Sequence, residues 1–191
     1  MDIRLEHLSK SFGEKQLLRE LNAVFPEGSV SAVLAPSGKG KTTLLRILLG
    51  LEKADGGTVS GMPEKISVLF QEDRLFPQLD AAQNIRALAP AGVGEEEISA
   101  LLEKLGIGEA LHRDVKVLSG GMARRVAIAR ALLAQSDILL LDEPFRGLDA
   151  DTRAVTARTV LEYSQGKTVI LFAHGREEAE LLGAVYILEL N

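Results

Sequence analysis

APSGKGKTT, residues 35–43, separates two segments of opposite character. Before it, residues 29–34 (SVSAVL) are a short apolar run, which favours a buried strand. After it, residues 43–51 (TLLRILLGL) are too rich in leucine and too long for another strand, which predicts a helix. The stretch is therefore a glycine-rich loop that connects the end of a strand to the N-terminus of a helix.

Glycine and lysine in this loop favour an anion-binding site over the alternative, a surface turn. Gly38 and Gly40 let successive backbone N–H groups converge, and the dipole of the following helix attracts negative charge. The stretch matches the phosphate-loop pattern G-x-x-x-x-G-K-[ST], except that Ala35 replaces the first glycine. Lys41 would reach the β- and γ-phosphates of a nucleotide, and the Thr42 hydroxyl would ligate Mg²⁺. The predicted nucleotide-binding positions of the loop are Ser37, Gly38, Lys39, Gly40, Lys41, Thr42 and Thr43.

Strand patterns recur on both sides of the loop. Two N-terminal strands, a hairpin-like region and four apolar strands are predicted at residues 2–8, 17–25, 55–61, 66–70, 138–141, 168–173 and 185–190. Helices are predicted near residues 150–163 and 176–182. Because strands alternate with helices, the fold class is α/β, with a largely parallel sheet between helices and an N-terminal antiparallel β region.

Residues 79–133 contain helical patterns and little strand signal, with helices predicted over 81–89, 95–105 and 122–133. In the last helix, Met122, Val126, Ala129 and Leu133 form one apolar stripe. We therefore predict one domain over residues 1–191, with a helical sub-domain inserted at residues 79–133.

The composition limits the possible partners. The 191 residues carry a net charge of -5, which argues against nucleic-acid binding, and they include no cysteine, which excludes disulfides and thiolate metal sites. The N-terminus has no apolar core of a signal peptide. No apolar run reaches the roughly 20 residues that span a bilayer, so a membrane role would need a partner subunit.

Residues 138–144 (ILLLDEP) read as a buried strand that delivers two carboxylates at its C-terminal end. Ligands of α/β sheets bind at this edge. Asp142 is placed to hold Mg²⁺ through water, and Glu143 is the candidate general base for an attacking water. Acids that only end a strand are the alternative, but the phosphate loop implies the same metal ion.

Residues 118–122 (LSGGM) form a second candidate anion site. Ser119 is a good helix N-cap, and Gly120 and Gly121 leave backbone N–H groups free at the start of the helix that follows. A simple capping turn is the alternative. Because one nucleotide does not need two such helix starts from one molecule, each start would serve a different copy of the chain.

Together these motifs resemble the nucleotide-binding subunit of ATP-binding cassette (ABC) transporters, from about Leu5 to Ala179. The resemblance implies a P-loop NTPase core, with ATP and Mg²⁺ as cofactors. It also implies a head-to-tail pair of copies, in which each ATP lies between the phosphate loop of one copy and Ser119, Gly120 and Gly121 of the other.

The resemblance assigns roles to four more residues. Phe12 would stack on adenine, although a lone phenylalanine in the core is the alternative. Gln71 would contact Mg²⁺ and water and couple to the membrane partner. Asp149 would lie in the loop that faces the second copy. His174 would contact the γ-phosphate, with a satisfied core histidine as its alternative. Glu143, His174, Lys41 and Gln71 form the implied catalytic set, and Thr42, Gln71 and Asp142 the implied metal ligands.

The segment QEDRLFP at residues 71–77 is similar to bacterial importers of nitrate, sulfonates and thiamine precursors. The resemblance implies a cytoplasmic ATPase on the inner face of the membrane. It would drive a separate transmembrane permease, through which a substrate-binding protein would act. Exporter ATPases, soluble cassettes of iron–sulfur assembly or cell division, and a module that no longer hydrolyses ATP are the alternatives.

Four positions depart from the family pattern, among them Ala123, which stands where arginine is common but supplies none of the Ser-Gly-Gly donors. Ala35 can replace glycine if its φ stays negative. Met122 stands where glutamine or glutamate is usual, but the Ser-Gly-Gly donors precede it. Gly175 stands where aspartate usually follows the histidine, which would loosen the positioning of His174.

Overall fold

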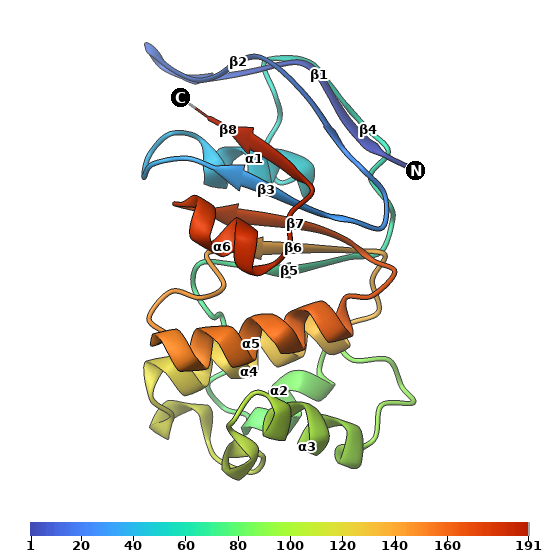
Figure 1. Cartoon of the computed structure of the whole chain (residues 1–191), viewed down its shortest axis with the longest axis vertical. Helices are drawn as coiled ribbons and strands as arrows, with labels where there is room; N and C mark the ends of the chain where they lie inside the picture. Colours follow the sequence, from blue (N-terminus) through green and yellow to red (C-terminus); the bar gives the residue numbers. More distant parts are fainter. Residues whose placement is uncertain (191) are drawn as a thin grey trace.

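The loop begins at the end of an inner strand of a parallel sheet. In the computed structural model, which describes residues 1–190, five strands pair in the order β5-β6-β7-β3-β8, and every neighbouring pair is parallel (Figure 1). The strands are β3 (Val30–Leu34), β5 (Ile66–Leu69), β6 (Ile138–Asp142), β7 (Thr168–Ala173) and β8 (Tyr186–Glu189). The structure confirms the predicted α/β class.

Alternate side chains of this sheet enter two different cores. In β6, Ile138 and Leu140 pack toward the N-terminal strands and the first helix, whereas Leu139 and Leu141 pack toward the other helices. Every residue of β6 and β7 is buried. A strand covered on both faces must be apolar throughout, which explains why these two segments read as continuous hydrophobic runs.

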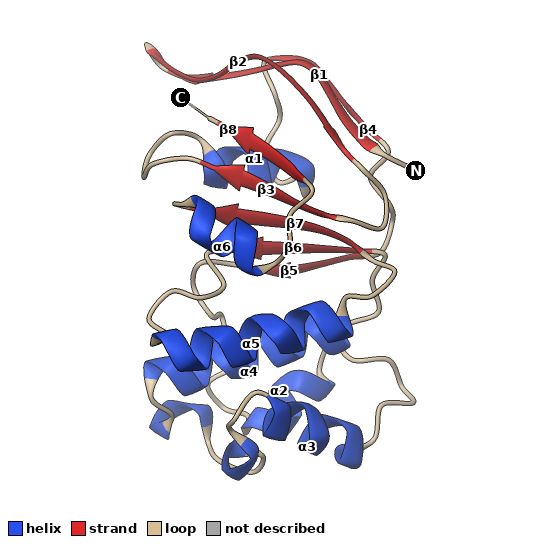
Figure 2. Cartoon of the chain, viewed as in Figure 1, coloured by secondary structure: helices blue, strands red, loops and turns tan. Residues whose placement is uncertain are grey.

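A three-stranded antiparallel sheet, in the order β2-β1-β4, covers one side of the parallel sheet (Figure 2). Its strands are β1 (Ile3–Phe12), β2 (Lys15–Phe25) and β4 (Gly56–Ser60). The N-terminal antiparallel region is therefore confirmed, but the predicted hairpin at residues 55–61 is wrong. The glycines there do not close a turn between two local strands, because β4 pairs with β1, about fifty residues earlier, with Leu5 opposite Val59.

Six α-helices occur among residues 1–190. They are α1 (Lys41–Leu48), α2 (Ala81–Arg86), α3 (Glu95–Lys104), α4 (Gly120–Leu133), α5 (Ala150–Tyr163) and α6 (Arg176–Leu181), and two short 3₁₀ turns, η1 (Gly108–Ala110) and η2 (Val115–Val117), link α3 to α4. α1 begins two residues before its predicted start and ends before Gly50, whose φ is 67°. α4 also begins two residues early, because Ser119 caps it.

The single apolar stripe predicted for α4 describes only part of its buried surface. Val126, Ala127, Ile128 and Ala129 are all buried although they follow one another in the chain. α4 contacts β5 as well as α2, α3 and α5, so nearly its whole circumference is covered. One apolar core runs from the sheet through α4 into α2 and α3. An inserted sub-domain at residues 79–133 stays a prediction.

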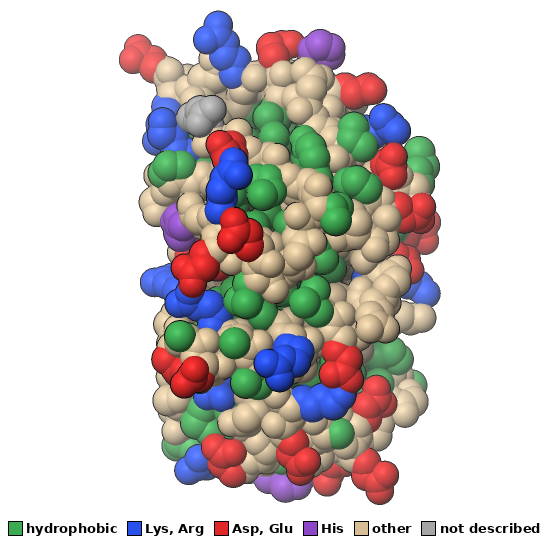
Figure 3. Space-filling view, in the orientation of Figure 1, with side chains coloured by type: hydrophobic (Ala, Val, Ile, Leu, Met, Phe, Trp, Pro, Cys, Tyr) green, Lys and Arg blue, Asp and Glu red, His purple; other side chains and the backbone are tan. Residues whose placement is uncertain are grey.

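Two further observations concern possible partners. None of the helices described for residues 1–190 is long and apolar enough to cross a membrane. On the face in Figure 3, the Lys and Arg side chains of the described residues alternate with Asp and Glu and form no continuous basic patch. The exclusion of nucleic acid as a partner stays a prediction.

Candidate active site

The loop between β3 and α1 has the backbone of an anion nest. Gly38 and Gly40 have φ values of 75° and 99°, in the left-handed region that favours glycine. A Cβ on Gly40 would lie 3.2 Å from the Leu17 carbonyl oxygen, so no side chain is accommodated there without a shift. Ala35, the departure from the pattern, is not among the residues with positive φ, and its N–H continues the sheet by donating to the Ala173 oxygen at 3.3 Å. Alanine therefore fits the first position of the loop.

Four of the predicted catalytic side chains meet at the carboxyl end of the sheet. The Lys41 Nζ donates to the Ala35 carbonyl oxygen at 2.6 Å and lies 3.0 Å from His174 Nδ1. The Glu143 Oε1 is 2.6 Å from His174 Nε2 and 3.7 Å from Lys41 Nζ. The Gln71 Nε2 donates to Glu143 Oε2 at 3.1 Å. Glu143 is thus the centre of a network that joins the ends of four segments.

The two carboxylates at the end of β6, Asp142 and Glu143, lie in different environments. Burial, and secondly the charge of Glu143, raises the pKa of Asp142 from 3.8 to about 6. Glu143 is only 7% exposed and has a φ of 49°, a strained value for a residue other than glycine. Its N–H donates to the Phe172 carbonyl oxygen at 2.9 Å, which extends the pairing of β6 and β7 by one residue.

A cavity of about 210 Å³ lies against the loop. Its lining includes Gln71 and Glu143 together with Leu17, Pro36, Ser37, Gly38, Gly40, Lys41, Thr42 and Thr43. The structure therefore brings the phosphate loop, the candidate base and the glutamine to one cavity, as the sequence predicted. The cavity is open to solvent, and its polar lining suits a charged ligand.

The Ser-Gly-Gly segment lies elsewhere. Ser119 Oγ accepts a hydrogen bond from the Met122 N–H at 3.3 Å, and Gly120 and Gly121 line a second cavity of about 260 Å³. Gln71 is the residue that borders both cavities, and no residue of the phosphate loop lines the second. Within one copy, these glycines therefore do not share a cavity with the loop.

Asp149 and Phe12 are also apart from the catalytic network. Asp149 caps α5 by accepting hydrogen bonds from the Thr152 N–H at 2.9 Å and Oγ1 at 2.7 Å, which lowers the pKa of Asp149. Phe12 is 50% exposed, with the Lys10 ammonium 4.9 Å from the centre of its ring. The core alternative for Phe12 is therefore wrong, and the ring is accessible to a ligand. His7 and His112 are exposed and lie outside this network.

Sequence reasoning missed Arg124, which is 3% exposed and donates to the carbonyl oxygens of residues 142–144, on both sides of Glu143, and to those of Phe70 and Gln71. The sequence offers little signal, because Arg124 is one of three arginines, with Arg125 and Arg130, in the helix that follows the Ser-Gly-Gly segment.

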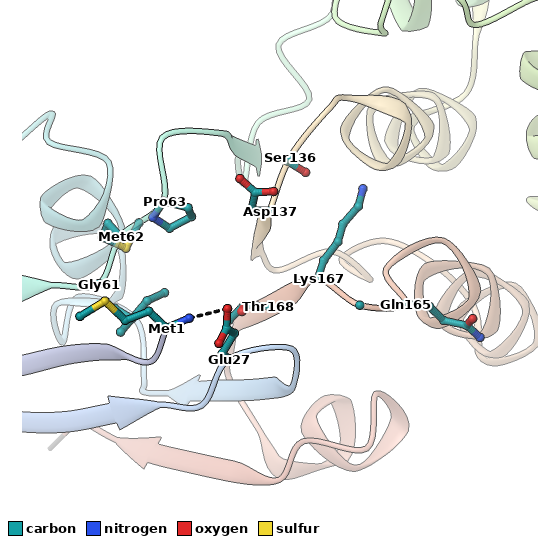
Figure 4. Close-up of a pocket in the computed structure, with 12 residues that line it drawn as sticks. Met1, Glu27, Gly61, Met62, Pro63, Ser136, Asp137, Gln165, Lys167 and Thr168 are labelled. Carbon is teal, nitrogen blue, oxygen red and sulfur yellow. Dashed lines mark ion pairs between the residues drawn. The ribbon is translucent and has the colours of Figure 1, made fainter.

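A larger cavity, of about 520 Å³, lies at the opposite end of the strands (Figure 4). Ser136 and Asp137 precede β6, Lys167 precedes β7, and the N-terminal amine of Met1 pairs with Glu27 at its edge. None of the predicted site residues lines it. Size alone would therefore select the wrong end of the sheet.

Known proteins match both the sequence and the fold. Residues 18–146 match the family model described as ABC transporter. An aliphatic sulfonates import ATP-binding protein of Pseudomonas syringae pv. tomato is 40% identical, over 94% of this chain and 77% of the relative. A sulfate/thiosulfate import ATP-binding protein of Vibrio cholerae is 38% identical, over 98% of this chain and 56% of the relative.

The structure of a bacterial Atm1-family ABC exporter with ATP bound aligns with a TM-score of 0.86 and 23% identity, over 100% of this chain and 37% of that one. At this identity the likeness shows the fold. The family model covers more than half of the chain, and it includes the phosphate loop, the Ser-Gly-Gly segment and the carboxylates after β6. The chain therefore belongs to the ABC transporter family.

Proposed function

We propose that this chain binds and hydrolyses ATP as the nucleotide-binding subunit of an ABC importer. The observation that carries the proposal is that Lys41, Gln71 and Glu143 line the cavity of the phosphate loop, where His174 contacts both Lys41 and Glu143. The relatives named above are import ATP-binding proteins, which supports import over export.

The nucleotide would lie with its phosphates on the loop. Backbone N–H groups of residues 37–43 and the ammonium of Lys41 would bind the phosphate oxygens. Phe12, with its exposed ring, would stack on the adenine.

The residues around the loop also fit Mg²⁺. This ion keeps several waters and is bound through one or two carboxylates together with substrate phosphates. Among residues 1–190 no group of three or more His, Cys, Asp or Glu side chains forms a separate metal cage. The buried carboxyl of Asp142, the Thr42 hydroxyl and the Gln71 amide oxygen would hold the ion. Bound there, it would neutralise negative charge on the phosphates.

Glu143 is the proposed general base. It would take a proton from water while the water oxygen attacks the γ-phosphorus, and the bond to the bridging oxygen would break to leave ADP. Lys41 and His174 would stabilise charge on the γ-phosphate, and Gln71 would orient the water. Lys41 and His174 both contact Glu143. ATP must therefore replace these contacts before the base is free.

A second copy would complete each site. Ser119, Gly120 and Gly121 lie outside the cavity of the phosphate loop, so their free N–H groups would serve the ATP bound by the partner copy. Asp149, at the start of α5, would lie in the loop that faces this second copy. The pair would be head to tail, since a symmetric pair places each loop against the other copy's glycines.

The chain would dock on the cytoplasmic face of a separate transmembrane permease, near Gln71 and the helices α2 and α3. A substrate-binding protein would act through that permease. An exporter ATPase or a soluble cassette remains the alternative, and co-purification with a permease discriminates the soluble class.

The test is the ATPase activity of the purified chain, measured as phosphate release with and without a permease that co-purifies with it. We expect magnesium-dependent hydrolysis that Lys41→Ala abolishes and that the permease stimulates. Absence of ATP binding would refute the nucleotide site, and binding without hydrolysis in the presence of the permease would refute the enzyme. A permease that neither binds the chain nor stimulates it would refute transport.

A further inference from the structure

We propose that Arg124 is a positioning residue, which fixes the backbone that carries Glu143 and Gln71 and links it to helix α4. The proposal rests on the function proposed above. Arg124 does not line the cavity of the phosphate loop. Its hydrogen bonds go to backbone carbonyl oxygens and to the Asp73 carboxylate, and to no side chain of the predicted ATP or Mg²⁺ site.

Arg124 joins the ends of two strands. Toward β6, its Nη2 donates to the carbonyl oxygens of Asp142 at 2.6 Å and Glu143 at 2.8 Å. Its Nε donates to the Pro144 carbonyl oxygen at 3.2 Å. Toward β5, its Nη1 donates to the Phe70 carbonyl oxygen at 2.7 Å. The same atom lies 3.4 Å from the Gln71 carbonyl oxygen and 3.0 Å from Asp73 Oδ1.

Only a guanidinium can make this set of contacts. It has five N–H donors in a rigid plane, whereas lysine has three donors on a single atom. The side chain of Arg124 is 4% exposed, and its one carboxylate partner, Asp73, is 28% exposed. A buried charge is costly unless hydrogen bonds compensate it. The carbonyl oxygens at the ends of β5 and β6 therefore compensate the buried charge of the Arg124 guanidinium, and the guanidinium in turn fixes the positions of these two strand ends.

The strain at Glu143 gives this arrangement a function. A φ of 49° persists in a residue other than glycine only when surrounding contacts hold it. The Glu143 N–H is fixed by Phe172, and its carbonyl oxygen by Arg124. Arg124 thus fixes the carbonyl side of the Glu143 backbone, whose conformation directs the Glu143 carboxylate toward His174 and Gln71.

The position of Arg124 on α4 adds a link between the two cavities. Arg124 lies one turn after Gly120 and Gly121, and all three line the second cavity with Gln71. A shift of α4 when its N-terminus binds the partner's ATP would act directly on the backbone of Glu143 and Gln71. The base would then be placed when the partner's nucleotide arrives.

The experiment compares Arg124→Gln and Arg124→Lys with Arg130→Gln. Arg130 is the matched control, because it lies on the same helix and donates to the carbonyl oxygens of Asp73 at 2.7 Å and Arg74 at 2.9 Å. Its hydrogen bonds do not reach residues 142–144. The measurements are kcat and KM for ATP, the Kd of ATP by calorimetry, and backbone deuterium uptake.

We expect both Arg124 variants to lose about tenfold to 10²-fold in kcat, because a displacement of the base by about 1 Å costs this much in rate. The Kd of ATP should stay within about threefold, because the phosphate loop is untouched. Deuterium uptake should rise at residues 70–74 and 142–146. Arg130→Gln should raise uptake near residues 73–74 alone and keep its kcat.

The proposal is overturned if Arg124→Gln and Arg130→Gln have the same kcat and the same uptake at residues 142–146. It is also overturned if kcat and ATP affinity fall together. Should Arg124→Gln fail to fold, Arg124→Lys keeps the stem and the charge and gives the same comparison. If the wild-type chain hydrolyses no ATP, the proposed function fails, and the uptake at residues 142–146 still decides the role of Arg124.

Discussion

Glu143→Gln removes the proposed base while it keeps the shape of the side chain. The glutamine oxygen can still accept the hydrogen bond from Gln71 Nε2, which is 3.1 Å long in the wild type. A general base contributes about 10²–10⁴-fold to the rate, which corresponds to about 3–5 kcal/mol of activation free energy. We therefore expect the first-order rate of ATP hydrolysis to fall by that factor.

The binding of ATP should be retained or become tighter. The side chains of Lys41 and Glu143 are 6% and 10% exposed, and 3.7 Å separates their charged atoms. At an effective dielectric constant of about 20, their attraction is about 4 kcal/mol before the cost of desolvation is subtracted. The phosphates compete with this attraction for Lys41, so its loss should raise ATP affinity by up to about tenfold.

The assay is single-turnover hydrolysis with the chain in excess over labelled ATP, together with equilibrium binding and gel filtration. The variant should trap ATP and elute as a dimer. Glu178→Gln is the control, because Glu178 is a half-buried carboxylate of α6, outside the cavity, whose pKa is raised by burial. A Glu143→Gln rate within about threefold of the wild type would refute Glu143 as the base.

Gly40→Ala should lower ATP affinity at least about tenfold and destabilise the chain by about 1–2 kcal/mol, because a φ of 99° strains a residue with a side chain and the new Cβ would lie 3.2 Å from the Leu17 carbonyl oxygen. Gly92→Ala, in open space, is its control in calorimetry, and equal ATP binding by both variants would contradict the loop geometry. Phe12→Ala should weaken ATP binding by about 1–3 kcal/mol and leave the urea midpoint unchanged, because the ring is 50% exposed; a large loss of stability alone would make Phe12 structural. Asp142→Asn should stabilise the nucleotide-free chain in EDTA by up to about 3 kcal/mol at pH 7.5, because the pKa of Asp142 is raised to about 6 and the wild type loses stability as the pH rises through this value. In urea titrations the difference in unfolding free energy between Asp142→Asn and the wild type should nearly vanish at pH 4. An equal difference at pH 4 and pH 7.5 would refute the raised pKa of Asp142 as its cause.

The sequence by itself determined the local parts of the site. Gly38 and Gly40 occur where the backbone needs a positive φ, so the pattern predicted the loop. The carboxylates after β6 and the histidine after β7 follow apolar runs, and parallel strands bring such ends to one edge. These inferences depend on periodicity and on neighbours in the chain, which is why they could be made before the fold was known.

Only the tertiary structure decided the rest. The pairing of β4 with β1, the burial of α4 on nearly all sides and the six acceptors of Arg124 all join segments that are distant in the sequence. An arginine in a helix that has three of them gives no sign of which backbone carbonyls it will meet. Likewise, the left-handed backbone of Glu143 follows from contacts with Phe172 and Arg124, because no local pattern favours that conformation for glutamate.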